Sequence, residues 1–341
     1  MVGNSGRTYR IDGTKFAVIS STLSIAELLA WYNDFRLYLH ESFVVDDKAI
    51  LLDLYCGALR VDGFDIDPQT VYACLNYAST ESKIKQQGDL VEFQNDLNEE
   101  SHRKLEKLHA IRASIMHGHE GFYLIYQPVV DAQTEQLIGA EALLRWRSDR
   151  YGTVPPDQFI PILESDPLFP ELGEWIIWES AFTAKQILKL YPDFVMNVNL
   201  SYTQLEKPDF VDMVLRILDD LDYPPDHLCL EVTERCRLLD LGLLKNVLAS
   251  LKSRGILVAL DDFGTGFSSV GILKEIPFSI IKIDRSFVRT IEENNIDRKI
   301  VQNIADLAHI FGAKVCVEGI ETGGMRDILL SYRVGSFQGG L

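Results

Sequence analysis

The sequence has few cysteines, no long hydrophobic run and little positive charge, and each of these shortages excludes a class of protein. The odd number of scattered cysteines, never spaced as CxxC, argues against a disulfide framework or a zinc site and favours a cytoplasmic setting. No stretch approaches the roughly 20 apolar residues of a membrane-spanning helix, and no signal peptide opens the chain. The formal charge of −17 disfavours binding to a nucleic-acid polymer, although bound cations would still admit a small anionic substrate.

Short apolar runs in the last two-thirds of the chain carry polar side chains of catalytic or metal-binding type at or near their ends. Runs this apolar are typical of parallel strands buried on both faces. In a closed barrel of such strands, the side chains at the carboxyl ends converge on one rim. The runs and their polar residues are LIGAEALLRW with Glu141, FVMNVNL with Asn199, LCLEV with Glu231, ILVALDD with Asp261 and Asp262, IIKID with Lys282, KVCVEG with Glu318, and SFQG with Gln338.

Strand and helix patterns alternate from about Gly121 onward, beginning with a strand over residues 123–130. Two of the helical patterns stop at Gly255 and Gly312, where a C-cap glycine is expected. Alternation over this length, with about eight strands, predicts an α/β fold in which residues 121–341 form a TIM-type (β/α)8 barrel.

The segment before the barrel has a different pattern. The sequence pattern of residues 1–95 predicts an α+β fragment with a hairpin, a helix and a strand over residues 49–61. Residues 96–120 predict a connecting helix, because Leu108, Ile111 and Ile115 fall close to helical spacing.

The polar residues of the predicted rim supply oxygen ligands almost exclusively, which is the choice of Mg²⁺ or Mn²⁺ rather than zinc. Four or five facing carboxylates would repel one another, so divalent metal is the expected partner. Glu318 would complete the shell of a second ion. The candidate first ligands are Glu141, Asn199, Glu231 and Asp261.

Two adjacent aspartates suggest a binuclear centre. Asp261 and Asp262 would point to opposite faces of a regular strand, so both can serve one site only if the chain leaves the strand there. Gly264 and Gly266 permit such a turn. A bridging aspartate would hold two metals about 3.5–4 Å apart, a centre that activates water for phosphodiester hydrolysis. Lys282 would orient that water or stabilise charge in the transition state.

Each of these residues also has an ordinary interpretation. A single strand-end carboxylate is more often a helix cap or a surface residue, and only the joint pattern on seven strands supports a site. His117 and His119 are spaced like metal ligands, but they precede the first barrel strand, where we expect a solvated loop. A phosphate-binding GxGxxG loop is excluded because Ser269 stands at the third glycine position.

These segments resemble the EAL family of cyclic-di-GMP phosphodiesterases from about residue 121 to the end. The resemblance implies a barrel whose first strand runs antiparallel to the others, and hydrolysis of cyclic-di-GMP to linear pGpG with two Mg²⁺ or Mn²⁺ ions. The matching blocks are YQPVV, EALLRW, FIPILE, NVNLS, EVTE, DDFGTGFSS, KIDRSFV and EGIET.

The resemblance also implies a role for each matching residue. Lys282 would act on the water together with the metal-bound Glu141, and Glu234 would brace the loop after Asp262, which in this family is linked to dimerisation through the barrel. An arginine beside a phosphodiester suits bidentate anion recognition. The implied metal ligands are Glu141, Asn199, Glu231, Asp261, Asp262 and Glu318, and the implied substrate contacts are Gln127, Leu143, Arg145 and Gln338.

The first segment is similar to the C-terminal half of a GGDEF domain, the diguanylate cyclase fold. YRIDGTKFAVI aligns with the family's YRxGGDEFAVI, but Asp12 replaces a glycine that approaches GTP, and Thr14 and Lys15 replace the two acids. We therefore expect no cyclase activity and a regulatory or structural role. The family's N-terminal half is missing here, and the family continues beyond Leu341, so we expect a fragment of a longer protein.

Three functions are compatible with these patterns. An active cyclic-di-GMP phosphodiesterase is favoured because every catalytic position is filled. A non-catalytic receptor for cyclic-di-GMP is the alternative, and the altered first segment supports it. A two-metal hydrolase of another phosphodiester is the third, since a family-level analogy does not fix the substrate.

Overall fold

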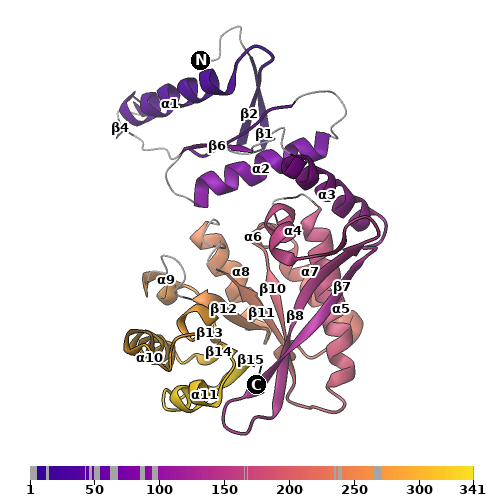
Figure 1. Ribbon diagram of the computed structural model, residues 1–341, viewed down its shortest axis with the longest axis vertical. Coiled ribbons are helices and arrows are strands. Elements are labelled where there is room, and N and C mark those ends of the chain that lie inside the picture. The colour runs from indigo at the N-terminus through magenta and orange to yellow at the C-terminus, as the bar shows by residue number, and fades with distance from the viewer. Residues whose placement is uncertain are drawn as a thin grey trace. The chain divides into compact units, whose positions relative to one another are not determined.

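The computed structural model describes residues 6–12, 15–42, 44–45, 48–49, 54–61, 68–84, 89–93, 99–164, 166, 168–233, 236, 240–263 and 270–340. The chain divides into two compact units, Met1–His109 and Ala110–Leu341 (Figure 1). Among the helices of the described residues, none combines the length and the apolar character needed to cross a lipid bilayer.

The described residues of the first unit include small sheets and long helices, as expected for an α+β fragment. The predicted hairpin is present as the antiparallel pair β1 (Arg7–Asp12) and β2 (Lys15–Ile19), and the predicted helix is α1 (Ile25–Ser42). Within the predicted strand over residues 49–61, the described residues contain the end of β4 (Lys48–Ala49) and the whole of β5 (Cys56–Leu59), which belong to different sheets; residues 50–53 lie outside the described part. Its elements are β1 (Arg7–Asp12), β2 (Lys15–Ile19), α1 (Ile25–Ser42), β3 (Val44–Val45), β4 (Lys48–Ala49), β5 (Cys56–Leu59), α2 (Pro68–Ile84) and β6 (Leu90–Phe93).

The predicted connecting helix is α3 (Glu99–Met116), which includes the boundary between the units. Leu108, Ile111 and Ile115 are buried on one of its faces, as their spacing predicts. The structure divides the chain at His109, inside this helix, so Ile111 and Ile115 belong to the core of the second unit.

The second unit is built of alternating strands and helices. Its elements are β7 (Phe122–Asp131), β8 (Leu137–Ser148), β9 (Gly152–Val154), α4 (Pro156–Leu163), α5 (Phe169–Ile187), β10 (Val195–Leu200), α6 (Tyr202–Leu205), α7 (Phe210–Leu221), η2 (Pro225–His227), β11 (Leu228–Val232), α8 (Leu241–Ser253), β12 (Leu257–Phe263), α9 (Val270–Glu275), β13 (Ile280–Ile283), η4 (Arg285–Phe287), α10 (Asn295–Ile310), β14 (Lys314–Ile320), α11 (Gly323–Leu330) and β15 (Ser336–Gly339).

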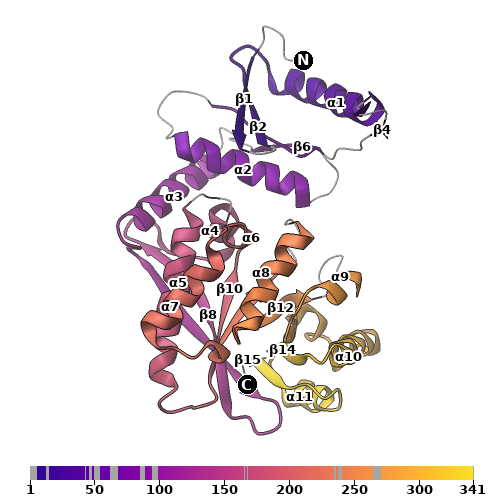
Figure 2. The same cartoon turned by 180° about the vertical axis from the view of Figure 1, so that it is seen from behind.

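Eight strands of this unit form a closed barrel. The strand order is β10, β11, β12, β13, β14, β15, β7 and β8, and β8 pairs with β10 to close the ring. Neighbours from β8 through β10 to β15 are parallel, whereas β7 is antiparallel to both β15 and β8. The predicted TIM-type barrel with an antiparallel first strand is therefore confirmed. The helices lie outside the strands, as Figures 1 and 2 show.

The core lies between the strands and the surrounding helices. Each long helix turns one apolar stripe to the sheet, as α5 does with Leu172, Ile176 and Ala181. Gly255 and Gly312 follow helices α8 and α10 with φ of 90° and 71°, so both adopt the left-handed conformation expected of a C-cap glycine. These turns start β12 and β14 in the register that brings their carboxyl ends to the same rim.

Candidate active site

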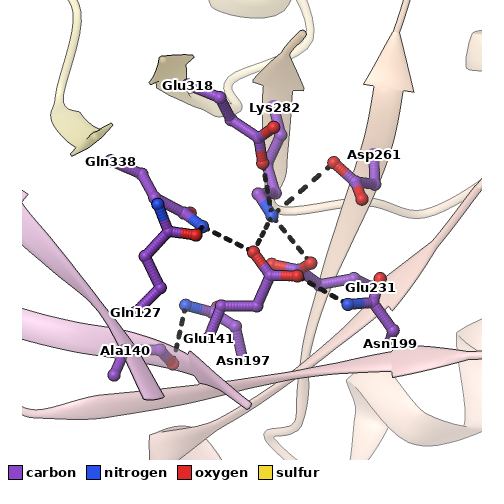
Figure 3. A network of polar contacts seen from close by, with 10 residues as sticks. All are labelled: Gln127, Ala140, Glu141, Asn197, Asn199, Glu231, Asp261, Lys282, Glu318 and Gln338. Carbon is purple, nitrogen blue, oxygen red and sulfur yellow. Dashed lines mark hydrogen bonds and ion pairs between the residues drawn. The ribbon is translucent and has the colours of Figure 1, made fainter. Parts of the chain in front are cut away.

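Each of the eight barrel strands contributes one polar side chain to a single network at the carboxyl ends of the parallel strands (Figure 3). The strand register explains the alignment, because Asn199 pairs with Glu231, and Glu318 pairs with Gln338. The rim network, as we call it, consists of Gln127 on β7, Glu141 on β8, Asn199 on β10, Glu231 on β11, Asp261 on β12, Lys282 on β13, Glu318 on β14 and Gln338 on β15.

Lys282 lies at the centre of the rim network and is 2% exposed. Its Nζ is 2.9 Å from Glu141 Oε2 and 2.8 Å from Glu231 Oε2. The same atom is 2.7 Å from Glu318 Oε1 and 3.6 Å from Asp261 Oδ1. A lone lysine on a strand is usually solvent-exposed, but here the carboxylates of four other strands make burial of the ammonium tolerable.

Glu141 is held by a second set of contacts from neutral amides. Asn199 Nδ2 donates to Glu141 Oε1 at 2.6 Å, and Gln338 Nε2 donates to Glu141 Oε2 at 2.6 Å. The same Gln338 nitrogen also donates to Gln127 Oε1 at 3.1 Å. These amides fix the orientation of the Glu141 carboxylate from both sides.

The second aspartate of the pair requires a break in its strand, as the sequence suggests. Asp262 has a φ of +54°, and the pairing of β12 with β13 shifts register between Leu260 and Phe263. Aspartate tolerates the left-handed conformation better than most residues, and such backbone outliers collect at functional sites. The alternation of a regular strand does not hold at this φ, so Asp262 and Asp261 are not restricted to opposite faces of β12. Gly264 and Gly266 lie outside the described residues.

Burial and mutual repulsion oppose full ionisation of the acidic cluster. Burial raises the pKa of Glu231 well above its ordinary value, and it raises the pKa of Glu318 to about 7 and that of Asp262 to about 6. Glu141 differs: burial also opposes its ionisation, but Lys282 and three hydrogen bonds hold its pKa below the usual range. Burial likewise disfavours the charged form of Lys282, yet the surrounding carboxylates raise its pKa well above the ordinary value.

The donor set fits two hard dications. The four acids of the rim network together with Asp262 carry five formal negative charges and Lys282 carries one positive charge, which leaves four negative charges for two divalent ions to balance. Glu231 Oε1, Asp261 Oδ1 and Gln338 Oε1 are buried without a hydrogen-bond partner, and metal ligation would satisfy the two carboxylate oxygens. Within the described residues, no three acidic side chains already form a coordination shell, since the Lys282 ammonium stands between them.

The residues predicted to contact substrate are placed around the network. Gln127 and Gln338 belong to it, whereas Leu143 and Arg145 lie farther along β8 and share the face of Glu141 by strand alternation. Arg145 Nη1 donates to the carbonyl oxygen of Leu144 at 2.8 Å. Glu234 lies outside the described residues, so its predicted bracing role stays a prediction.

A buried asparagine and a pair of histidines lie outside the rim network. Asn197, which the strand-end pattern does not single out, is buried below the network and donates from Nδ2 to Ala140 O at 3.4 Å. Its position two residues before Asn199 places it on the same face of β10, and this spacing is the feature of the sequence that indicates it. His117 and His119 are not among the network residues: the ring of His119 stacks on Trp175 with centroids 5.3 Å apart. The interpretation of this pair as metal ligands therefore gains no support.

A model of the EAL domain family matches residues 109–341. The chain is 34% identical to the bifunctional diguanylate cyclase/cyclic di-GMP phosphodiesterase MucR of Pseudomonas aeruginosa, over 72% of this chain and 36% of that protein. It is 31% identical to an uncharacterised protein of Synechocystis, over 90% of this chain and 44% of that protein. The chain thus spans less than half the length of these curated relatives.

The chain is also similar to solved structures of EAL proteins. The structure of the PaMucR phosphodiesterase in complex with c-di-GMP superposes with a TM-score of 0.63 at 34% identity, over 68% of this chain and 94% of that one. The EAL enzyme Bd1971, in its form with cAMP and cyclic-di-GMP bound, gives a TM-score of 0.67 at 29% identity, over 80% of this chain and 72% of that one.

Proposed function

Because the chain belongs to the EAL domain family, we propose that its barrel is a two-metal phosphodiesterase that hydrolyses cyclic-di-GMP to linear pGpG. The observation that carries the proposal is the rim network, in which all eight strands supply one polar group and the acids exceed the cation in charge. Two relatives that are 34% identical to this chain over the aligned residues, 248 and 203 in number, are named as phosphodiesterases of the same dinucleotide.

The residues that would hold the two Mg²⁺ or Mn²⁺ ions are Glu141, Asn199, Glu231, Asp261, Asp262 and Glu318. When bound, the ions supply a water of lowered pKa and a clamp on the phosphate oxygens. Gln338 and Asn199 keep Glu141 oriented through hydrogen bonds to its two oxygens.

Lys282 is the residue we assign to the attacking water. Its ammonium is held among carboxylates of four different strands, so its position is fixed without help from a mobile loop. A positive charge at this point would orient the water and stabilise the negative charge that develops on phosphate. Arg145 and Gln127 would bind the substrate beside it, since both lie on the face that continues from Glu141.

A receptor that binds the dinucleotide without cleaving it is the second candidate. The specific observation in its favour is that Lys282 already neutralises part of the acidic cluster, so the site is compatible with folding before metal binds. The complete set of acids favours the enzyme, because a receptor has no need of so many uncompensated carboxylates.

The first unit is proposed to be a degenerate GGDEF-like domain that regulates or supports the barrel. Its hairpin β1–β2 carries the YRIDGTKFAVI segment, and Lys15 stands at the beginning of β2 in place of an acid. The EAL family match begins only at His109, the last residue of this unit. The dimer through the barrel that the resemblance implies is also a proposal, which sedimentation velocity would test.

The test is turnover of cyclic-di-GMP by the full chain with Mn²⁺ or Mg²⁺, followed by chromatographic detection of pGpG. We expect product from the wild type and none from Glu141→Gln, and we expect Ca²⁺ to inhibit, because its larger and looser shell suits an octahedral two-metal site poorly. Binding without product would favour the receptor. Neither binding nor product would leave a different phosphodiester as the substrate and would overturn the proposal.

A further inference from the structure

The β7–β8 ladder continues beyond the point where the barrel ends. Strand β8 pairs with β10 only from Gly139 to Ala142, but its pairing with β7 runs on to Trp146. Outward from the pair Gln127–Glu141, the next pairs on the same face are Ile125–Leu143 and Tyr123–Arg145. Each step of two residues adds about 7 Å. The ladder thus carries these side chains away from the rim network toward solvent.

The two faces of this extension differ sharply in burial. Phe122, Leu144 and Trp146 face the helices and are buried, with Trp146 Nε1 donating to Ser114 Oγ at 3.2 Å. On the opposite face Tyr123 and Ile125 remain 40% and 41% exposed. The buried face fixes the ladder in place, so the exposed face is a rigid surface.

Single exposed apolar residues are common and need no explanation. These two differ because they lie on the face that begins at Gln127 and Glu141, both members of the rim network. A ligand whose phosphodiester lies at the carboxylates would therefore extend along this face. An aromatic ring and a branched aliphatic side chain offer such a ligand a surface for a planar, weakly polar group.

We propose that Tyr123 and Ile125 form a base-contacting wall that packs against one purine of a cyclic dinucleotide. The inference rests on the proposed function in taking cyclic-di-GMP as the ligand, but it requires binding only and not turnover. Stacking on an aromatic side chain suits any purine, because every base has a π-face. Arg145, the cross-strand partner of Tyr123, places a guanidinium next to the wall, where it contributes a cation–π or hydrogen-bond contact to the same base.

The experiment compares Tyr123→Ala with Tyr123→Phe, and uses Tyr191→Ala as a matched control. Tyr191 is 44% exposed and lies in the loop before β10, at the amino ends of the parallel strands. Binding of cyclic-di-GMP is measured by calorimetry with Ca²⁺, and kcat and KM are measured with Mn²⁺. Circular dichroism checks that each variant is folded.

We expect Tyr123→Ala to raise Kd and KM about tenfold with kcat nearly unchanged, as the loss of one stacked base predicts. Tyr123→Phe and Tyr191→Ala should remain within about twofold of the wild type, which is about 0.4 kcal/mol. Weaker binding by Tyr123→Ala supports the wall even if no variant turns over substrate. If the wild type binds and Tyr123→Ala binds equally well, the wall is refuted while the proposed function stands; if the wild type neither binds nor cleaves, both are refuted.

Discussion

Replacing Lys282 with methionine removes the one cationic side chain of the ten residues drawn in Figure 3. Its Nζ lies within 2.9 Å of three carboxylates, and the side chains of Lys282 and Glu231 are 3% and 1% exposed. Removing one partner of a buried ion pair costs about 3–5 kcal/mol, because the remaining charge is left without compensation. We therefore expect Lys282→Met to lower the free energy of unfolding of the metal-free protein by about 3–5 kcal/mol near pH 8, where the carboxylates are most fully ionised.

The destabilisation caused by Lys282→Met should depend on pH and on bound metal. Burial raises the pKa of Glu318 to about 7, so this carboxyl takes up a proton as the pH falls and no longer needs the lysine. The destabilisation should therefore shrink toward pH 5. At pH 8, Mn²⁺ should restore much of the stability, because dications bind the same carboxylates in the folded state alone.

The assay is urea unfolding followed by tryptophan fluorescence, with EDTA or with Mn²⁺. Three of the four tryptophans, Trp146, Trp175 and Trp178, belong to the second unit, and Trp146 is fully buried among its core side chains, so the emission reports mainly on this unit. Lys245→Met is the matched control: its Nζ lies 2.6 Å from Glu275 Oε2, but both side chains are about half exposed, so the cost should be about 0–1 kcal/mol. Two results would show that the ion pairs assigned to Lys282 are wrong. One is that Lys282→Met is no less stable than Lys245→Met in EDTA, and the other is that Mn²⁺ does not reduce the difference in unfolding free energy between Lys282→Met and the wild type.

Two further predictions concern metal uptake and the backbone of β14. Burial raises the pKa values of Glu318 and Asp262 to about 7 and about 6, so Mn²⁺ binding near pH 6 should release protons, and fewer protons should be released as the pH rises toward 8. Calorimetry in two buffers of different ionisation enthalpy measures the number of protons released, and a number near zero at every pH would contradict this prediction. Gly312→Ala should lower the free energy of unfolding by about 1–2 kcal/mol, because alanine is strained at the positive φ of this position. Gly319→Ala should lower it clearly more, because the position has a positive φ and the added Cβ would also lie 2.4 Å from Arg285 Cβ. Equal unfolding midpoints of the two variants would refute the clash.

The strand-end pattern made most of the rim network predictable from the sequence. Parallel strands place their carboxyl ends together, so Asn199, Glu231 and Glu318 follow from the position of each polar group in its apolar run. The departure of Asp262 from regular strand geometry was also foreseeable, since adjacent residues on a strand cannot share a face. These predictions rest on local sequence and on one topological rule.

Features that depend on register between distant strands were not predictable. Nothing in the sequence near Tyr123 indicates that Arg145 lies opposite it, because antiparallel register is fixed by the buried side chains of both strands. The burial of Lys282 depends in the same way on carboxylates from four other strands. In the first unit, the apolar run over residues 49–61 suggested one strand, but periodicity alone does not locate the ends of such a run.

The charges of the centre also explain why the acids differ in pKa. Glu141 receives the lysine and three hydrogen bonds in all, so its pKa falls although it is buried. Glu318 lies 2.7 Å from the same ammonium, yet its pKa rises to about 7, because one positive charge is shared among several carboxylates and desolvation outweighs its share. Asp262, beside Asp261 on the distorted end of β12, is likewise raised. The pKa values of Glu231 and Asp261 are raised as well, so among these five acids Glu141 alone has a lowered pKa. A bound dication would stabilise the ionised form of the other four.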